Sequence, residues 1–470
     1  MQIGGLKKLQ TGQELARREQ VLLIAQLSWP AILAQISFVV MQYIDTAMVG
    51  QLGSHASASI GVVSSTTWLF GDLCAGLTIG FNVIVAQELG AGQEERARAI
   101  MKQAFLVCIA FSLLLLAAGM LIYTDLPGWL HGDPDIWRDA SAYFGVYALS
   151  LPFMQMNNIC GGMLRSSGNM KTPGLCMGAM CILDVIFNSF LIFSSGTLHI
   201  FGIALPGAGL GVLGASLGTA LSQVVVAGIL GYMLLGRSPE LRLRSGDKAA
   251  PAWSQLRRCL RISAPVMAER GILTSAHMVM TSVVAPLGII ATAANSLAVT
   301  AESLCYMPAY GVQNAASTLV GQSIGAGRKD LTYPLGKRTV LMGMGMMAIT
   351  GLLLYLLAPA MMGMMSVDPA VIALGVQVLR IEAFAEPLFG ASIVSNGVFQ
   401  GAGSTVIPML LNFGTMWGIR LPLAMLLAPR MGLMGVWIAM AVQLSVSGLC
   451  FLVRLLGKGW LPRMMRAQRN

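Results

Sequence analysis

The sequence predicts an all-α integral membrane protein whose twelve transmembrane helices form two parallel, pseudo-symmetric lobes of six helices each. Three observations support this prediction: an apolar composition, a repeat of half the chain length, and basic residues concentrated in alternate connections. Hydrophobic residues make up 56% of the 470 residues, and charged residues make up only 11%. A soluble domain has roughly 25% charged residues, so this chain has too few to cover a surface that faces water.

Glycine and proline residues of the first half recur in the second half at a constant separation of 235 positions, which is half the chain length. This separation is called the repeat distance below. Pro30 returns as Pro265 (265 minus 30 is 235 positions), and Gly90–Gly92 returns as Gly325–Gly327. The other matches at this distance are Gly53 with Gly288, Gly168 with Gly403, and Pro173 with Pro408. These two residue types restrict the backbone more than any others, so the constant distance indicates two halves with one fold.

Beyond Pro173 the distance shortens. Gly211 and Gly214 match Gly432 and Gly435 at 221 positions (432 minus 211), so the first half carries 14 extra residues (235 minus 221). We expect these residues in 194–209, as a longer external turn.

Apolar runs long enough to cross a bilayer, about 20 residues each, recur from Val21 to Arg454, and twelve can be counted. Of the 30 Lys and Arg residues, 25 lie in alternate connections and in the two tails. The positive-inside rule therefore predicts a multi-pass protein of the cytoplasmic (inner) membrane with both termini in the cytoplasm. The basic residues behind the net charge of +10 thus lie in loops and tails beside membrane lipids. This distribution indicates no nucleic-acid partner.

One long, charged, proline-containing connection divides the chain. The predicted segments are a cytoplasmic tail (1–20), a first lobe (21–237), a cytoplasmic linker (238–258), a second lobe (259–457) and a second cytoplasmic tail (458–470). Because six spans is an even number, both lobes enter the membrane from the same side and the repeat is parallel.

The sequence offers little for enzyme chemistry. The GxGxxG pattern at 209–214 follows no predicted strand, and close helix packing explains it better than nucleotide binding. There is no GxxxxGK[ST] motif, and neither the eight cysteines nor the four histidines have the spacing of metal ligands. We therefore expect a protein that is not an enzyme and has no cofactor.

Carboxylates within the spans are the candidates for function, because an ionised side chain at bilayer depth costs about 2.5–3.5 kcal/mol. The candidates are Asp45, Asp72 and Asp184 in the first half and Glu269, Glu302 and Glu386 in the second. Glu382 lies near a predicted span end beside Arg380, so a solvated or interfacial position is expected for it.

A cation-coupling site is predicted in the first lobe. Asp184 and Asn188 are four residues apart and share one helix face. Together with Asp45 and Thr219 they offer carboxylate, amide and hydroxyl oxygens, which suit Na⁺. The same carboxylates suit a proton, because exclusion of water favours their neutral form. The alternative for these residues is polar contact between helices, and Asp72, Glu269, Glu302 and Glu386 are secondary candidates.

Six stretches of the chain carry a resemblance to a known family: MQYIDTAMVGQLG, QELGAGQEERA, LRSSGNMKTP, VAPLGIIATAANSLAV, STLVGQSIGAGRKD and FQGAGSTVIP. Together, over about 22–455, they resemble the multidrug and toxic compound extrusion (MATE) family. The resemblance implies two six-helix lobes in a V and a carrier that exports organic cations or lipophilic drugs in exchange for H⁺ or Na⁺. We expect it to act as a monomer on small molecules.

The resemblance also implies roles for single residues. Asp45 matches the family's cation-site aspartate, and Thr219 matches its sixth-span hydroxyl. The family's Asn-then-Asp order in the fifth span is exchanged here, as Asp184 and Asn188. The second-lobe acids of some members correspond to Leu273 and Phe389, so a cation site of that type is not expected.

Two alternatives remain. A flippase for lipid-linked precursors or metabolites, on a related fold, would need several basic residues in its cavity, and the spans offer only Arg270 and Arg420. A non-transporting receptor or channel would not need the repeat of an alternating-access carrier.

Overall fold

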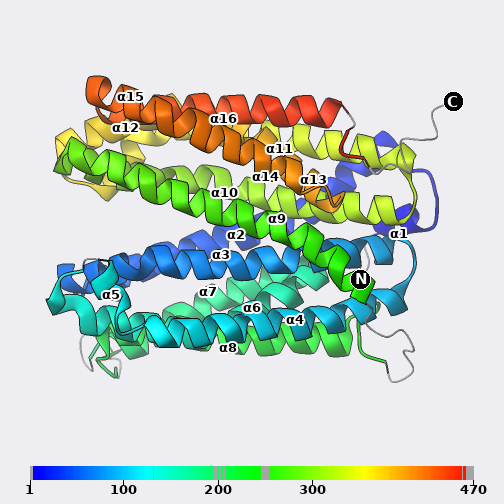
Figure 1. The fold of residues 1–470 in the computed structure, drawn as a ribbon, viewed down its shortest axis with the longest axis horizontal. Helices are drawn as coiled ribbons and strands as arrows, with labels where there is room; N and C mark the ends of the chain where they lie inside the picture. The colour runs from blue at the N-terminus through cyan, green and yellow to red at the C-terminus, as the bar shows by residue number, and fades with distance from the viewer. Residues whose placement is uncertain are drawn as a thin grey trace. The chain divides into compact units, whose positions relative to one another are not determined.

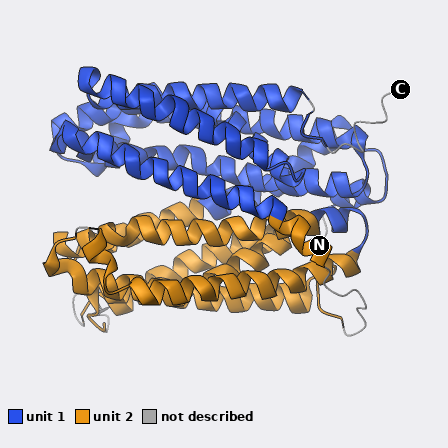
Figure 2. Cartoon of the chain, viewed as in Figure 1, with its two compact units in different colours: residues 1–35, 86–93, 261–470 blue, residues 36–85, 94–260 orange. Residues whose placement is uncertain are grey.

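The computed structural model describes residues 4–130, 132–194, 199–200, 203–204, 207–244, 253–457 and 459–461. Its described part is helical except for one small hairpin (Figure 1). The chain forms two compact units: unit 1 is Met1–Gln35, Ala86–Gln93 and Arg261–Asn470, and unit 2 is Ile36–Val85 and Glu94–Leu260 (Figure 2). The predicted lobe boundaries remain a prediction.

The helices of the first half are α1 (Gly4–Gln10), α2 (Arg17–Gly50), α3 (Ser54–Gly90), α4 (Glu94–Ile122), α5 (Leu126–Trp129), α6 (Trp137–Ser166), α7 (Lys171–Ile192) and α8 (Gly211–Tyr232). Those of the second half are α9 (Trp253–Val284), α10 (Ile289–Gly325), α11 (Lys329–Met365), α12 (Pro369–Ala383), α13 (Glu386–Gly401), α14 (Val406–Thr415), α15 (Leu421–Met431) and α16 (Leu433–Leu456). Short helical turns are η1 (Pro134–Ile136) and η3 (Ala285–Leu287), and π-helical turns are η2 (Met233–Arg237) and η4 (Met416–Arg420).

Eight helical segments of the described chain are long and apolar enough to cross a membrane: α2, α3, α4, α7, α8 with η2, α11, α14 to α15, and α16. Four further segments, α6, α9, α10 and the consecutive pair α12–α13, match the remaining predicted spans. The structure is therefore all-α, as the sequence predicts.

The turns confirm that the repeat describes the backbone. Gly53 has a φ of 104° and its match Gly288 has 102°; Gly92 has 73° and Gly327 has 68°. Matched pairs further along the chain agree as well: Gly168 (90°) with Gly403 (72°), and Gly211 (56°) with Gly432 (60°). A side chain is disfavoured at such positive φ, so glycine recurs where the same turn recurs.

In unit 2, α6 packs against α4 and α8, and α8 packs against α7. The Ser166 hydroxyl donates to the carbonyl of Asn82, 2.8 Å away, and so joins α6 to α3. The Tyr147 hydroxyl makes a second bond of this kind, 2.6 Å long, to the carbonyl of Thr67. Side-chain bonds to backbone carbonyls satisfy polar groups that water does not reach.

In unit 1, α13 packs against α10, α11 and α16. A Cβ on Gly401 would overlap the backbone of Ser317, so α13 and α10 touch along their backbones. These two residues lie one repeat distance after Ser166 and Asn82. The same helix contact is thus made by a small residue in one half and by a hydroxyl in the other.

Two further contacts inside unit 1 are reciprocal. A Cβ on Gly90 would overlap the backbone of Gln322, and a Cβ on Gly325 would overlap the backbone of Gln87. Gly90 and Gly325 are one repeat distance apart, and so are Gln87 and Gln322. The ends of α3 and α10 therefore cross about a local two-fold axis, with glycine at each side of the crossing.

The extra residues of the first half include a small antiparallel hairpin, β1 (His199–Ile200) and β2 (Ile203–Ala204). A bridge between Ser194 and Ala208 closes its base. Residues 195–198, 201–202 and 205–206 lie outside the described part of the chain.

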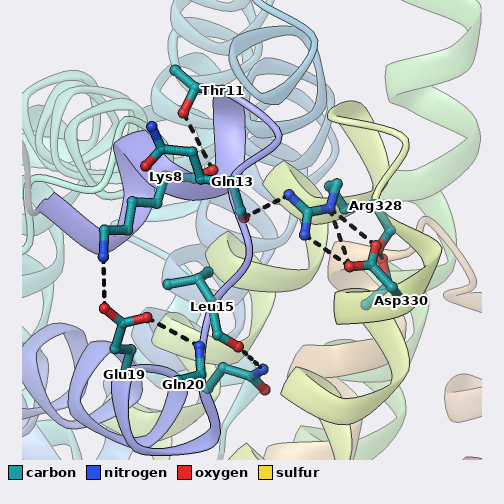
Figure 3. A network of polar contacts seen from close by, with 10 residues as sticks. Lys8, Thr11, Gln13, Leu15, Glu19, Gln20, Arg328 and Asp330 are labelled. Atoms are coloured by element: carbon teal, nitrogen blue, oxygen red, sulfur yellow. Dashed lines mark hydrogen bonds and ion pairs between the residues drawn. The ribbon is translucent and has the colours of Figure 1, made fainter.

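The N-terminal segment is held to the turn between α10 and α11 by polar contacts within unit 1 (Figure 3). Lys8 Nζ lies 2.6 Å from Glu19 Oε1. Arg328 donates to the carbonyl of Gln13 (2.8 Å) and to Asp330 (2.8 Å). The bond to Asp330 raises the pKa of the Arg328 guanidinium. Leu6 and Leu9 of α1 are buried, so the segment is part of the folded unit.

Candidate functional site

The two aspartates predicted to couple a cation lie together in unit 2, joined by Asn188. Asn188 Nδ2 donates to Asp45 Oδ1, 2.8 Å away, and to Asp184 Oδ2, 3.0 Å away. Asp45 comes from α2, and the other two residues come from α7. Asp184 and Asn188 are fully buried, and Asp45 is half-buried.

The local sequence explains this arrangement. Asp184 and Asn188 are one helical turn apart, so their side chains project from the same face of α7. That face meets α8 at Gly218, where a Cβ would overlap Asn188 Oδ1. The absence of a side chain at Gly218 therefore leaves room for the amide to reach both aspartates.

A hydroxyl completes the group, although it is not the predicted one. Ser222 Oγ on α8 is fully buried and lies within hydrogen-bond distance of Asp184 Oδ1 (3.2 Å), and the carbonyl of Thr219 (2.9 Å) is a second acceptor for its single hydrogen. Thr219 instead donates to the carbonyl of Ala215, 3.2 Å away, and has no bond to either aspartate in the described chain. Ser222 was missed, although a serine one turn beyond Thr219 was a detectable signal. The predicted role of Thr219 remains a prediction.

One atom of this site has no hydrogen-bond partner in the described part of the chain. Asn188 Oδ1 is buried and accepts no hydrogen bond from any described residue. A buried acceptor of this kind normally has a donor, a water molecule or an ion beside it. Two carboxylates, an amide oxygen and a hydroxyl are ligands that suit Na⁺, and the paired carboxylates also suit a proton. The residues present therefore fit the predicted coupling ion.

Tyr143 of α6 forms part of the surroundings of this site. It lies within electrostatic range of both Asp45 and Asp184, and its ring packs against apolar residues of α2, α3 and α6. This residue was not predicted, because nothing in its local pattern relates it to α2 or α7.

The other first-half acid, Asp72, does not join this group. It is half-buried on α3 and lies near Tyr147 of α6.

In unit 1, Glu269 is held by two amides. Its Oε1 accepts from Asn396 Nδ2 at 2.8 Å and from Asn412 Nδ2 at 2.6 Å, while its Oε2 is buried without a partner among the described residues. Asn412 is 143 residues after Glu269, and Asn188 is also 143 residues after Asp45. Both halves thus join an acid of their first long helix to an asparagine of their fifth.

Three further acids of unit 1 lie together. Glu302, Glu382 and Glu386 each place an oxygen within 4.8 Å of the others, and all three are buried. The expected solvated position of Glu382 is therefore wrong. Residues two apart on a helix point in nearly opposite directions. Arg380 is accordingly exposed over the Tyr355 ring, and Glu382 faces the interior.

Comparisons with known proteins agree with this architecture. The family model described as MatE matches residues 30–190 and 265–426. The two matched segments begin at Pro30 and Pro265, one repeat distance apart, so the family model recognises each half of the repeat separately.

Relatives match nearly the whole chain. A probable multidrug resistance protein NorM of Thermotoga maritima is 25% identical over 442 residues, covering 94% of this chain and 93% of the relative. Another protein of that name, from Chromobacterium violaceum, is 28% identical and covers 91% of both chains.

A solved structure described as the outward-facing conformation of a multidrug resistance MATE family transporter has the same fold. Its TM-score is 0.87 at 19% identity, covering 97% of this chain and 99% of the other. With the family model matching both halves, this chain belongs to the MatE family of multi-pass membrane transporters.

Proposed function

We propose that the protein is a cation-coupled antiporter of the cytoplasmic membrane. It exports organic cations or lipophilic compounds by alternating access, in exchange for H⁺ or Na⁺. The observation that carries this proposal is the buried bridge from Asn188 to Asp45 and Asp184, with the unpartnered Asn188 Oδ1 beside it.

The site supports coupling through charge. Two carboxylates side by side repel each other, and burial makes their ionised forms costly. A cation that enters between them removes both penalties. Asn188 donates to both acids, and its oxygen, which accepts no bond from a described residue, could serve a Na⁺ or the hydroxyl of a protonated carboxyl. Loading therefore changes how α2, α7 and α8 contact one another.

Antiport follows if cation and substrate favour opposite states of the carrier, because a ligand shifts an equilibrium only by its difference in affinity for the two states. The cation loads from outside, releases the substrate there and is discharged inside. The protein works without covalent chemistry, as a monomer, with both termini in the cytoplasm.

The rival function, export of a pyrophosphate-linked lipid, has little support from the basic residues. Arg420 is buried, and its guanidinium lies against methionine sulfurs and within electrostatic range of glutamates. That surrounding suits an internal countercharge better than a phosphate contact.

Export of a fluorescent organic cation from proteoliposomes tests the proposal. The pH gradient and the Na⁺ gradient are imposed separately, with the membrane potential clamped. Saturable export that depends on one of the two gradients is expected. Equal export without either gradient would contradict coupling, and flux that does not saturate would indicate a channel.

A further inference from the structure

Unit 1 buries a cluster of three glutamates, two of which lie near a buried arginine. Glu302 (α10), Glu382 (α12) and Glu386 (α13) come from three different helices, and their oxygens lie within 4.8 Å of one another. Glu382 and Glu386 are 0% exposed, and Glu302 is 6% exposed. Both oxygens of Glu382 are buried without a hydrogen-bond partner among the described residues.

Arg420 supplies the one positive charge near this cluster in the described chain. It ends the π-helical turn η4, is 9% exposed, and lies within electrostatic range of Glu302 and Glu382. Its terminal nitrogens donate to the sulfurs of Met416 and Met440, which are weak acceptors, and its Nε has no partner among the described residues. Arg420 therefore lies near two of the three acids, while no carboxylate of the described chain accepts a hydrogen bond from it.

Charge balance determines how many of the three glutamates are protonated. Three ionised carboxylates would carry a charge of −3 against the single charge of Arg420. An uncompensated charge buried in the interior costs several kcal/mol, whereas one ionised carboxylate beside Arg420 leaves the cluster neutral. We propose that Glu302, Glu382 and Glu386 form a proton-binding site that holds two protons in this conformation, with Arg420 balancing the third carboxylate.

The surroundings favour protons over a metal ion. A fixed, buried positive charge repels a metal cation, and Ca²⁺ would want six to eight oxygen ligands. The neighbouring side chains instead offer sulfur: Met416, Met440 and the thiol of Cys305, which lies beside Glu386. The titratable and charged groups that face the cluster are Arg420, Cys305 and Tyr306, with His277 of α9 near Arg420.

This site differs from both cation sites considered above. The Asp45 group lies in unit 2, and the second-lobe positions implied by the family resemblance hold Leu273 and Phe389. Release of one proton would leave a second buried carboxylate uncompensated, so proton release is favoured only when water reaches the cluster. The cluster thus links the solvation of unit 1 to its proton content. A role of this proton release in transport rests on the proposed function. The protonation of the two glutamates does not.

Infrared spectroscopy of the purified full-length protein tests the inference, using the absorption of protonated carboxyl groups at neutral pH. We expect Glu382→Gln to remove one carboxyl equivalent from this absorption, because one of the two remaining acids still balances Arg420. We expect Arg420→Met to add one equivalent, because nothing then favours an ionised carboxylate. Asp139→Asn and Arg430→Met change exposed residues and are expected to leave the absorption unchanged.

An absorption that is unchanged in both Glu382→Gln and Arg420→Met would overturn the inference. Loss, on adding Na⁺ or Ca²⁺ at fixed pH, of that part of the absorption which Glu382→Gln removes would overturn it in favour of a metal site. If Arg420→Met does not fold, Glu382→Gln together with Glu386→Gln decides, since each must remove one equivalent. Export assayed in parallel separates the two ideas, because failure of export in the wild type would refute antiport while leaving the carboxyl count intact.

Discussion

Each half of the chain joins an acid on its first long helix to an asparagine on its fifth, and the two pairs differ in where along the helix they lie. Asp45 follows Pro30 by about four helical turns, whereas Glu269 follows the matching Pro265 by about one turn. The difference of about three turns corresponds to about 16 Å of helix. The pairs also differ in charge, because Asn188 bridges two aspartates and Asn412 shares one glutamate with a second amide.

This difference shows which properties the repeat preserves. The turns and the reciprocal crossing of α3 and α10 recur, since each depends on a glycine whose replacement would strain or displace the backbone. The acids do not recur at the repeat distance, because a polar pair can form at any depth where two helices face each other. The halves therefore share their scaffold, and each has its own buried chemistry.

The largest effect is expected from Asp45→Asn, which removes the charge that a cation would neutralise. Gradient-driven export in proteoliposomes should fall at least about tenfold, in line with the 5- to 150-fold range typical of coupling between sites. Wild-type export by this variant would show that the first-half pair is only a contact between helices.

Gly218→Ala should come next, since the new methyl group would overlap Asn188 Oδ1. Overpacking of this kind costs about 1–3 kcal/mol, so the melting temperature and export should both fall. Gly228→Ala is the matched control on the same helix, because a Cβ there meets nothing within 4 Å. Equal behaviour of the two variants would mean that α8 does not fix the amide.

The repeated turns should be equally sensitive to substitution. Gly92→Ala and Gly327→Ala each place a side chain at positive φ in open space, which should cost about 1–2 kcal/mol in each half. Thermal melts should show similar losses for the two variants. Gly345→Ala, in open space on a regular helix, should not destabilise the protein. A large loss at only one of the two turns would break the structural equivalence of the halves.

The smallest effect is expected from Glu269→Gln. Glutamine keeps an oxygen to accept from Asn396 and Asn412, and it places an amide where Oε2 has no partner among the described residues. Export should stay within about threefold of wild type, because the oxygen that accepts from both amides is kept and no hydrogen bond of the pair is lost. A loss as large as that of Asp45→Asn would make the second-half pair an equal member of the coupling machinery.

Much of the fold could be predicted because its signals are local. Glycine and proline mark turns, and apolar length marks spans, so the twelve segments and the matched halves follow from the sequence. The pairing of Asp184 with Asn188 follows from helix geometry alone. Contacts between helices need the relative rotation of both, which explains why Thr219 was chosen where Ser222 makes the contact. Glu382 was judged by its neighbour Arg380 in the sequence, whereas the helix turns the two side chains apart.

The assignment of the N-terminal segment, Met1–Gln35, to unit 1 has a consequence for how the chain is made. The rest of that unit consists of Ala86–Gln93 and Arg261–Asn470, so the N-terminal segment meets most of its partners last. At about 5–20 residues per second, synthesis of the 315 residues from Gln13 to its partner Arg328 takes roughly 15–65 seconds. During that interval Leu6, Leu9 and the start of α2 must wait without Arg328 and its turn. Unit 2 can therefore fold first. Unit 1 can complete its folding only after its last-synthesised segment packs against the N-terminal segment.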